Sequence, residues 1–223
     1  MTFQRQYVLL FLALVFASTI SVSLLAVRSF YTGYLLFAFL GWNLILAWLP
    51  FLFATVVIMF PGKHYVTFFF SILWLLFFPN ALYIVTDLLH LWPRGDVPLW
   101  YDMILLMSFA LTGLCLGFAS LAMMQTQISD RWGRIGGWLF VLAALALSGF
   151  GVYIGRFMRW NSWDVVSNPF SLLIDLQLNL TTPLLLAKTA VVTLGLTAVF
   201  TFTYIVFTIL PQTTSMTQVY SGD

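Results

Sequence analysis

A candidate ligand-binding set lies in the stretch GRFMRWNSWD, which spans residues 155–164. Its polar and aromatic members are Arg156, Arg159, Trp160, Asn161, Trp163 and Asp164. Arginines three residues apart share one face of a helix, and each guanidinium can hold a carboxylate or a phosphate through paired hydrogen bonds. The two tryptophans can stack on a ligand or, alternatively, belong to an interfacial aromatic belt beside snorkelling arginines. The stretch therefore predicts a site for an anionic group, with a membrane anchor as the other interpretation.

A second set of residues could perform acid–base or metal chemistry. Asp87 and His90 are three residues apart in one predicted helix, and Asp102 follows at the start of the next. An imidazole titrates near neutral pH and suits a general acid or base, and two carboxylates with one imidazole can also ligate a metal. This spacing is not specific for a metal, so a structural hydrogen-bond network is the preferred interpretation. Asn80, which follows the helix-bending Pro79, is expected to bond freed backbone groups and joins the ligand-binding candidates.

The composition excludes several classes of protein. The chain has 223 residues, of which 62% are hydrophobic and 7% charged, and all seven acidic residues are aspartates. A soluble domain needs far more surface charge, and no basic run with interleaved aromatic residues points to nucleic acid. The single Cys115 provides neither a disulfide framework nor a CxxC metal pair, and the residue pattern identifies no cofactor. These features indicate a protein of the lipid bilayer.

Six apolar stretches are long enough to cross a bilayer, which takes about 20 residues. We expect an all-α polytopic membrane helix bundle with six transmembrane helices over about 7–27, 34–60, 66–86, 100–124, 135–155 and 183–210. Residues 1–210 would form a single transmembrane domain and residues 211–223 a polar C-terminal tail. We expect a polar loop over 125–134, and Asp96 as the cap of the fourth helix. Residues 171–180 alternate with a period of two, which fits either an extended segment or a helix at the membrane interface.

Counting spans assigns the polar groups to two sides of the membrane. The loops around 87–99 and 156–182 fall on one side, together with five of the seven aspartates. Opposite charges can pair there, and Asp87 and Asp102 are candidate partners for the two arginines of the ligand-binding set. The other side then keeps free positive charge, which favours cytoplasmic N- and C-termini. We therefore expect one polar pocket at the opposite face, built by the ends of the third and fifth helices and the start of the fourth.

Three functions compete for this pocket. The first is binding of an anionic lipid-like ligand or of a membrane-protein partner. The second is a membrane-embedded hydrolase or transferase acting on a lipid-linked substrate, in which His90 would be the acid or base and Asp87 and Asp102 its orienting groups or metal ligands. A transporter ranks third, because transport usually needs ionisable groups near the bilayer midplane and these lie at a rim. The residues alone leave open whether the protein is an enzyme.

Five motifs carry a resemblance to a known family. They occur in order as WNLILAWLP (42–50), FPNALYIVTDLLHL (78–91), LWYD (99–102), SFALTGLCLGFASL (108–121) and GFGVYIGRFMRWNSWD (149–164). Over roughly residues 40–170 the chain resembles the bacterial membrane family catalogued as domain of unknown function 1361. The resemblance implies a multi-pass protein of the bacterial inner membrane. It implies no established activity, cofactor or catalytic residue.

Overall fold

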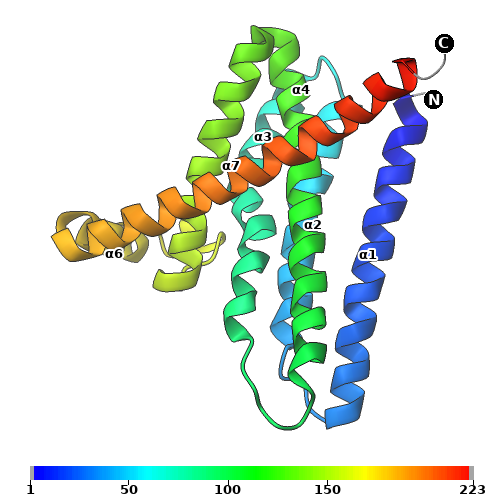
Figure 1. The fold of residues 1–223 in the computed structure, drawn as a ribbon. Helices are drawn as coiled ribbons and strands as arrows, with labels where there is room; N and C mark the ends of the chain where they lie inside the picture. The colour runs from blue at the N-terminus through cyan, green and yellow to red at the C-terminus, as the bar shows by residue number, and fades with distance from the viewer. Residues whose placement is uncertain (1–2, 221–223) are drawn as a thin grey trace. The chain divides into compact units, whose positions relative to one another are not determined.

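The computed structural model describes the backbone of residues 3–220 and the side chains of residues 5–209, and this part of the chain contains helices and no strand. The expected all-α membrane bundle is thereby confirmed. The α-helices are α1 (Phe3–Thr32), α2 (Ala38–Met59), α3 (His64–Tyr83), α4 (Leu99–Tyr153), α5 (Asp164–Ser167), α6 (Pro169–Thr181) and α7 (Pro183–Tyr220). A 3-10 helix, η1 (Ile84–His90), continues α3, and a π-helix, η2 (Ile154–Met158), continues α4. Figure 1 traces these elements along the chain.

The expected count of six spans is not exact. Among the described residues, five helical runs are long and apolar enough to cross a membrane: Arg5–Thr32, Ala38–Met59, His64–His90, Leu99–Met158 and Pro183–Ile209. The fourth run has 60 residues, or roughly 90 Å of helix at 1.5 Å per residue. That length far exceeds a hydrocarbon core of about 30 Å. Gly133, with φ 75° and ψ 173°, breaks the run, so the fourth and fifth expected spans are two helices that meet at one residue.

The expected loop over residues 125–134 is wrong, because the chain is helical on both sides of Gly133. Glycine can adopt a positive φ of 75° at no steric cost. This single residue therefore interrupts the helix, and the chain needs no loop of several residues here. Close packing follows the break: a Cβ added to Gly137 would collide with the Ser129 hydroxyl. Residues 171–180, for which the sequence left an extended segment or a helix open, lie within α6. Residues 211–220, which belong to the expected polar tail, are helical as part of α7.

The contacts group the chain into two units, Met1–Ser120 (unit 1) and Leu121–Asp223 (unit 2). In unit 1 the core lies between α2, α3 and the first part of α4, where Trp74 stacks on Phe78 at 4.6 Å and donates from Nε1 to the Ser120 hydroxyl at 3.2 Å. Gly113 admits the close approach that its spacing from Gly117 predicts. A Cβ at Gly113 would lie 2.8 Å from the backbone oxygen of Ala81. Small residues four positions apart let helix backbones approach in this way.

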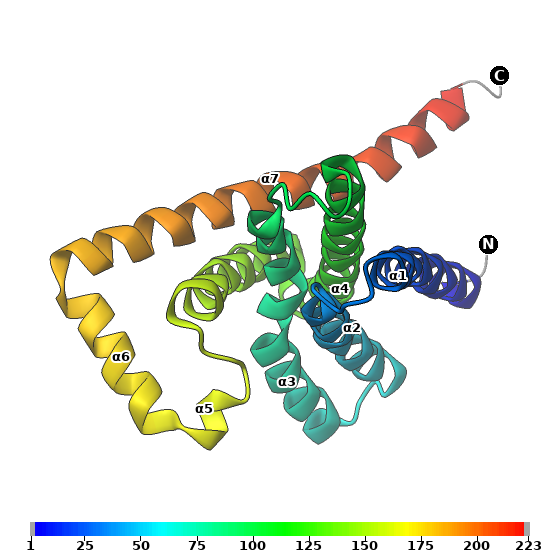
Figure 2. The same cartoon turned by 90° about the horizontal axis from the view of Figure 1, so that it is seen from below.

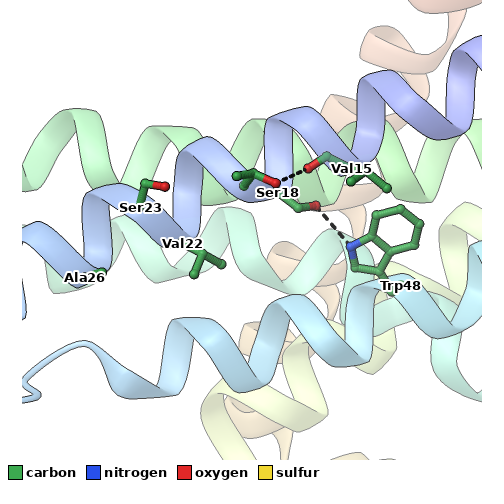
Figure 3. Close-up of a pocket in the computed structure, with 7 residues that line it drawn as sticks. Val15, Ser18, Val22, Ser23, Ala26 and Trp48 are labelled. Carbon is green, nitrogen blue, oxygen red and sulfur yellow. Dashed lines mark hydrogen bonds between the residues drawn. The ribbon is translucent and has the colours of Figure 1, made fainter.

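Helix α1 is attached to the rest of unit 1 by polar contacts. Trp48 Nε1 donates to the Ser18 hydroxyl at 3.0 Å, and the Ser21 and Thr112 hydroxyls lie 3.3 Å apart. Beside the first contact runs an open, mostly apolar groove of about 440 Å³ between α1 and Trp48 (Figure 3). Because the Ser18 hydroxyl itself donates to the Leu14 carbonyl, this serine has no spare donor for a polar ligand.

Unit 2 begins with the helical segments on either side of Gly133 and ends with α7. Tyr204 on α7 donates its hydroxyl to the Gln125 side chain at 2.6 Å. A Cβ at Gly149 would lie 2.8 Å from the backbone oxygen of Thr193, so the second part of α4 also packs closely on α7. After η2 the chain turns through α5 and α6 before entering α7 at Pro183 (Figure 2). This region carries the stretch 155–164.

Candidate functional site

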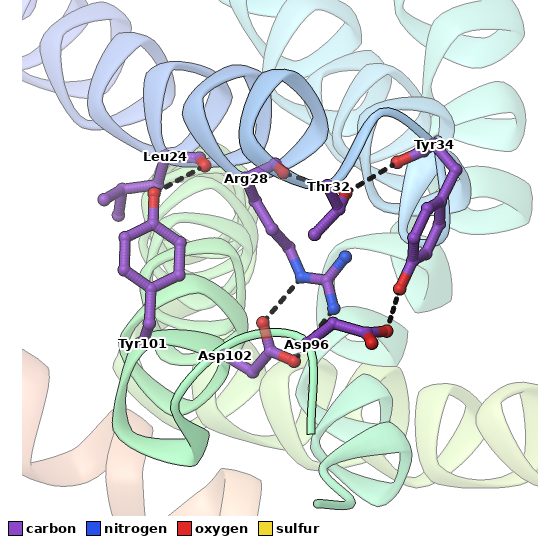
Figure 4. Close-up of polar contacts among 7 residues, drawn as sticks. All are labelled: Leu24, Arg28, Thr32, Tyr34, Asp96, Tyr101 and Asp102. Atoms are coloured by element: carbon purple, nitrogen blue, oxygen red, sulfur yellow. Dashed lines mark hydrogen bonds and ion pairs between the residues drawn. The ribbon is translucent and has the colours of Figure 1, made fainter. Parts of the chain in front are cut away.

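A buried ion pair holds one end of unit 1. Arg28 donates from Nε to Asp102 Oδ1 at 2.6 Å and from Nη2 to Asp102 Oδ2 at 3.1 Å (Figure 4), and each residue is 2% exposed. Asp102 lies in the first turn of α4, as the sequence predicts, where a carboxylate suits the helix dipole. The neighbouring Tyr101 hydroxyl donates to the Leu24 carbonyl at 2.9 Å. Both oxygens of Asp102 are therefore taken by Arg28, whereas sequence reasoning proposed the arginines of 155–164 as its partners.

Two loops close over this ion pair. The turn between α1 and α2 and the 91–98 loop lie at the same end of unit 1 (Figure 1) and meet where the Tyr34 hydroxyl donates to the Asp96 carboxylate (Figure 4). This hydrogen bond, more than any other contact, raises the pKa of the Tyr34 phenol above its ordinary value. Asp96 lies before α4, which begins at Leu99, and its carboxylate accepts from Tyr34. Because a cap residue directly precedes the first helical residue, Asp96 is not in the cap position that the sequence predicts for it.

The Phe37 ring links two cations at the same end. Its centroid is 4.6 Å from the Arg28 guanidinium and 5.1 Å from the Arg94 guanidinium. Phe37 is 1% exposed, whereas Arg94 is on the surface. A cation over an aromatic face is attracted by the ring quadrupole, so Phe37 positions both guanidinium groups at one end of unit 1.

Asp87 and His90 come together as their spacing predicts, but in the 3-10 helix η1, where residues three apart eclipse one another. His90 Nδ1 lies 3.2 Å from the Asp87 carbonyl oxygen and 4.0 Å from its Oδ1. Asn43 on α2 donates to Asp87 Oδ2 at 2.8 Å, which is the interhelical hydrogen bond expected of an intramembrane asparagine. Asn80, which directly follows Pro79 within α3, donates to the Phe77 carbonyl at 3.0 Å.

The metal-binding alternative has no geometric support in the part of the chain that the structure describes. No group of three or more His, Cys, Asp or Glu side chains in that part is arranged to hold a metal ion. Of the three candidate ligands, Asp102 is engaged by Arg28, while Asp87 and His90 lie together beside Asn43.

In unit 2 the stretch 155–164 is folded around its own polar groups. Trp160 Nε1 donates to Asp175 Oδ2 on α6 at 3.0 Å, which fixes the indole. Asp164 at the start of α5 accepts from the Asn161 backbone N–H at 2.6 Å and from the Ser167 hydroxyl at 3.3 Å. Both aspartates are thus hydrogen-bonded by neutral donors.

Three cations of unit 2 lie in or beside this stretch. Arg156 is half-buried in η2, and Arg159 follows in the left-handed conformation with φ 62° and ψ 31°, exposed to the surroundings. Lys188 on α7 lies 4.8 Å from the Phe157 ring, and Tyr153 stacks on the same ring at 5.3 Å. Trp163 is exposed and begins the turn into α5. The structure therefore brings Lys188, which sequence reasoning left outside the site, to the stretch 155–164.

Sequence reasoning missed most of the Arg28 cluster. Tyr34, Phe37 and Arg94 lie in or next to connecting segments, where no periodic pattern indicates which side chains meet. One signal was present: Arg28 ends the first apolar stretch, on the side predicted for Asp102. Since a buried arginine in a span needs an acidic partner, that shared side favours the observed pair.

Comparison with known proteins gives one match. The family model described as "Protein of unknown function (DUF1361)" matches residues 42–211. No curated protein matches the chain, and no solved structure does. The matched range includes Asn43, Asp87 in η1, Asp102 at the start of α4 and the whole stretch 155–164. With a match over most of its length, the chain belongs to the DUF1361 family.

Proposed function

We propose that this protein is a multi-pass protein of the bacterial inner membrane that binds an anionic lipid head group in unit 2. The cations would be Arg156, Arg159 and Lys188, with Trp160 and Trp163 beside them and both chain termini in the cytoplasm. A phosphate diester in the membrane interface has the charge and oxygen geometry that arginine recognises.

The observation that carries this proposal is the pairing of the aspartates. Asp175 accepts from Trp160, and Asp164 accepts from Asn161 and Ser167. Among the described side chains, neither Arg159 nor Lys188 forms a salt bridge, and both are exposed. The local carboxylates are therefore fixed by neutral donors, which leaves these two cations available to an anion from the membrane.

Helix α6 supports a position at the membrane interface. It has 13 residues, or about 20 Å of helix, which is too short to cross a hydrocarbon core of about 30 Å. Its apolar side chains are nevertheless exposed, among them Phe170, Leu173, Ile174 and Leu178. A short helix with exposed apolar residues is stabilised when it lies in the interface, which is the level of lipid phosphates.

Native mass spectrometry of protein from nanodiscs tests the proposal. The variant combines Arg159→Gly, which suits the positive φ, with Lys188→Gln. The control combines Arg131→Gln with Arg134→Gln, two exposed arginines of the same unit. We expect retained phosphatidylglycerol to fall at least several-fold in the variant and to stay unchanged in the control, with little change for phosphatidylcholine. Equal retention of phosphatidylglycerol in both proteins would contradict the proposal.

A second function, hydrolysis of or transfer from a lipid-linked substrate, is favoured by the contacts at η1. Asn43 holds the Asp87 carboxylate at 2.8 Å, the carboxylate faces His90 Nδ1, and the imidazole is 39% exposed. An imidazole whose Nδ1 is held by a backbone oxygen at 3.2 Å and whose ring is partly exposed can act as a general base. Release of phosphate from lipid-linked phosphates by the purified protein, abolished in His90→Gln, would support catalysis. Equal release by His90→Gln would rule out this role for His90.

A further inference from the structure

Among the described residues of unit 1, one buried side-chain nitrogen lacks a hydrogen-bond partner. Arg28 Nη1 is buried and has no acceptor within the described residues, whereas Nε and Nη2 of the same guanidinium are both bonded to Asp102. In Figure 4 the third nitrogen points away from Asp102, toward the side where Thr32 and Tyr34 lie. Buried polar groups without partners are rare in folded proteins, and a bound ion or water commonly satisfies such a group.

The acceptors around Arg28 that are nearest in the cluster are engaged by other donors. Both oxygens of Asp102 are engaged by the other two guanidinium nitrogens, and Asp96 accepts from Tyr34. The Thr32 hydroxyl donates to the backbone oxygens of Arg28 and Tyr34, so it is oriented as a donor. No contact among the described residues supplies an acceptor to Nη1, and an oxygen from outside the chain can do so.

A second cation contacts the same aromatic ring as Arg28. Arg94 contacts the same Phe37 ring at 5.1 Å and forms no salt bridge among the described side chains, although Asp96 is only two residues away. Phe37 thus holds two guanidinium groups, each of which can donate paired hydrogen bonds to an oxyanion. The charges of the two arginines are cancelled by those of Asp96 and Asp102. An anion would therefore be recognised by the positions of the two guanidinium groups and not by a net positive charge.

We propose that this end of unit 1 is an oxyanion site, separate from the one in unit 2, in which a phosphate group accepts from Arg28 Nη1 and from Arg94. Tyr34 and Asp96 are exposed and lie on the outer side of the buried pair, so their hydrogen bond is the contact that must open to admit the anion. The phosphate can belong to a lipid head group or be free in solution, and both sources offer the same oxygens.

The test uses the full chain carrying Arg159→Gly and Lys188→Gln, so that the unit 2 site does not contribute. Isothermal titration calorimetry with inorganic phosphate measures binding of the free anion. Retention of phosphatidylglycerol from nanodiscs, followed by native mass spectrometry, measures binding of the lipid. Two further variants are made in this background. Arg28→Lys can still pair with Asp102 but lacks the forked donors of a guanidinium, and Arg94→Gln removes the exposed cation. Arg5→Gln, an exposed cation of α1, is the control.

We expect one of the two ligands to bind the background protein and its affinity to fall at least about tenfold in both Arg28→Lys and Arg94→Gln, but not in Arg5→Gln. Binding of inorganic phosphate assigns a soluble anion, and binding of phosphatidylglycerol alone assigns a lipid. If Arg28→Lys does not fold, Arg94→Gln decides the outcome. Absence of binding to both ligands, or unchanged affinity in Arg94→Gln, would overturn this site and leave the unit 2 proposal unaffected.

Discussion

The guanidinium of Arg28 and the carboxylate of Asp102 lie edge to edge, with Nε 2.6 Å from Oδ1 and Nη2 3.1 Å from Oδ2. The arginine is near the C-terminal end of α1 and the aspartate is in the first turn of α4, so each charge has the sign that its helix dipole favours. The pair joins two helices that are far apart in sequence. Because both side chains are almost completely buried, neither charge has water as an alternative partner.

Removal of one member of this pair should destabilise the protein strongly. Asp102→Asn leaves the Arg28 charge buried without a counter-charge, which typically costs about 3–5 kcal/mol. We expect a correspondingly lower midpoint of thermal unfolding in detergent. The double variant Arg28→Leu with Asp102→Leu removes both charges and should be clearly more stable than Asp102→Asn. If the double variant is as unstable as the single one, the pair contributes through shape and not through charge.

Gly113 should tolerate no side chain. A Cβ there would lie 2.8 Å from the Ala81 backbone oxygen and 3.1 Å from the Ile84 side chain. Overpacking of this kind costs about 1–3 kcal/mol, so Gly113→Ala should lower the unfolding midpoint. Gly41→Ala is the matched control, because nothing lies within 4 Å of its added Cβ. That variant should be neutral or slightly stabilising, since alanine is the better helix former. Equal behaviour of the two variants would contradict the close contact between α3 and α4.

The fold was largely predictable because bilayer spans are encoded by local composition. Long apolar runs with few charges identify helices without knowledge of their neighbours. The error over 125–134 has a physical cause: its polar residues predict a loop, but they also support helix, and Gly133 alone supplies the break. The period of two in 171–180 likewise reflects polar residues of the short helix α6 and not a strand.

The candidate sites were predictable only where residues are close in sequence. Asp87 with His90, and Trp160 with its neighbours, could be grouped from spacing because one turn of chain brings them together. The pairing of Arg28 with Asp102 spans 74 positions and depends on how α1 packs, which no local pattern contains. Phe37 and Arg94 meet across two connecting segments, so their contact follows from tertiary structure alone.

The Tyr34–Asp96 contact should respond to alkaline pH. The Asp96 carboxylate accepts a hydrogen bond from the Tyr34 phenol and thereby raises the pKa of Tyr34. The nearby positive charges of Arg28 and Arg94 lower this pKa, but only in part. Because the folded pKa is raised, the stabilisation is complete below the ordinary tyrosine pKa of about 10 and is lost as pH rises through the folded value. Ultraviolet titration of phenolate should therefore show one late-titrating tyrosine fewer in Tyr34→Phe than in the wild type.

Asp96→Asn is the control for this titration, because it removes the carboxylate but keeps a polar side chain. We expect the late component to shift back toward the ordinary tyrosine value in Asp96→Asn. Arg131→Gln, in unit 2, should leave the titration unchanged. Identical titration curves for the wild type and Asp96→Asn would show that the two loops are not joined by this hydrogen bond.

Arg159 combines a strained backbone with an exposed charge. Its φ of 62° is the one positive value among the described non-glycine residues, and a left-handed residue with a Cβ costs roughly 1–2 kcal/mol. Arg159→Gly should therefore keep or raise the unfolding midpoint, whereas Arg159→Val, whose branched Cβ resists this conformation, should lower it. Both variants lose the guanidinium, so both should retain less phosphatidylglycerol. If stability is equal in the two variants, the left-handed turn is absent. If Arg159→Gly is stable yet retains all its lipid, the turn serves only to end η2.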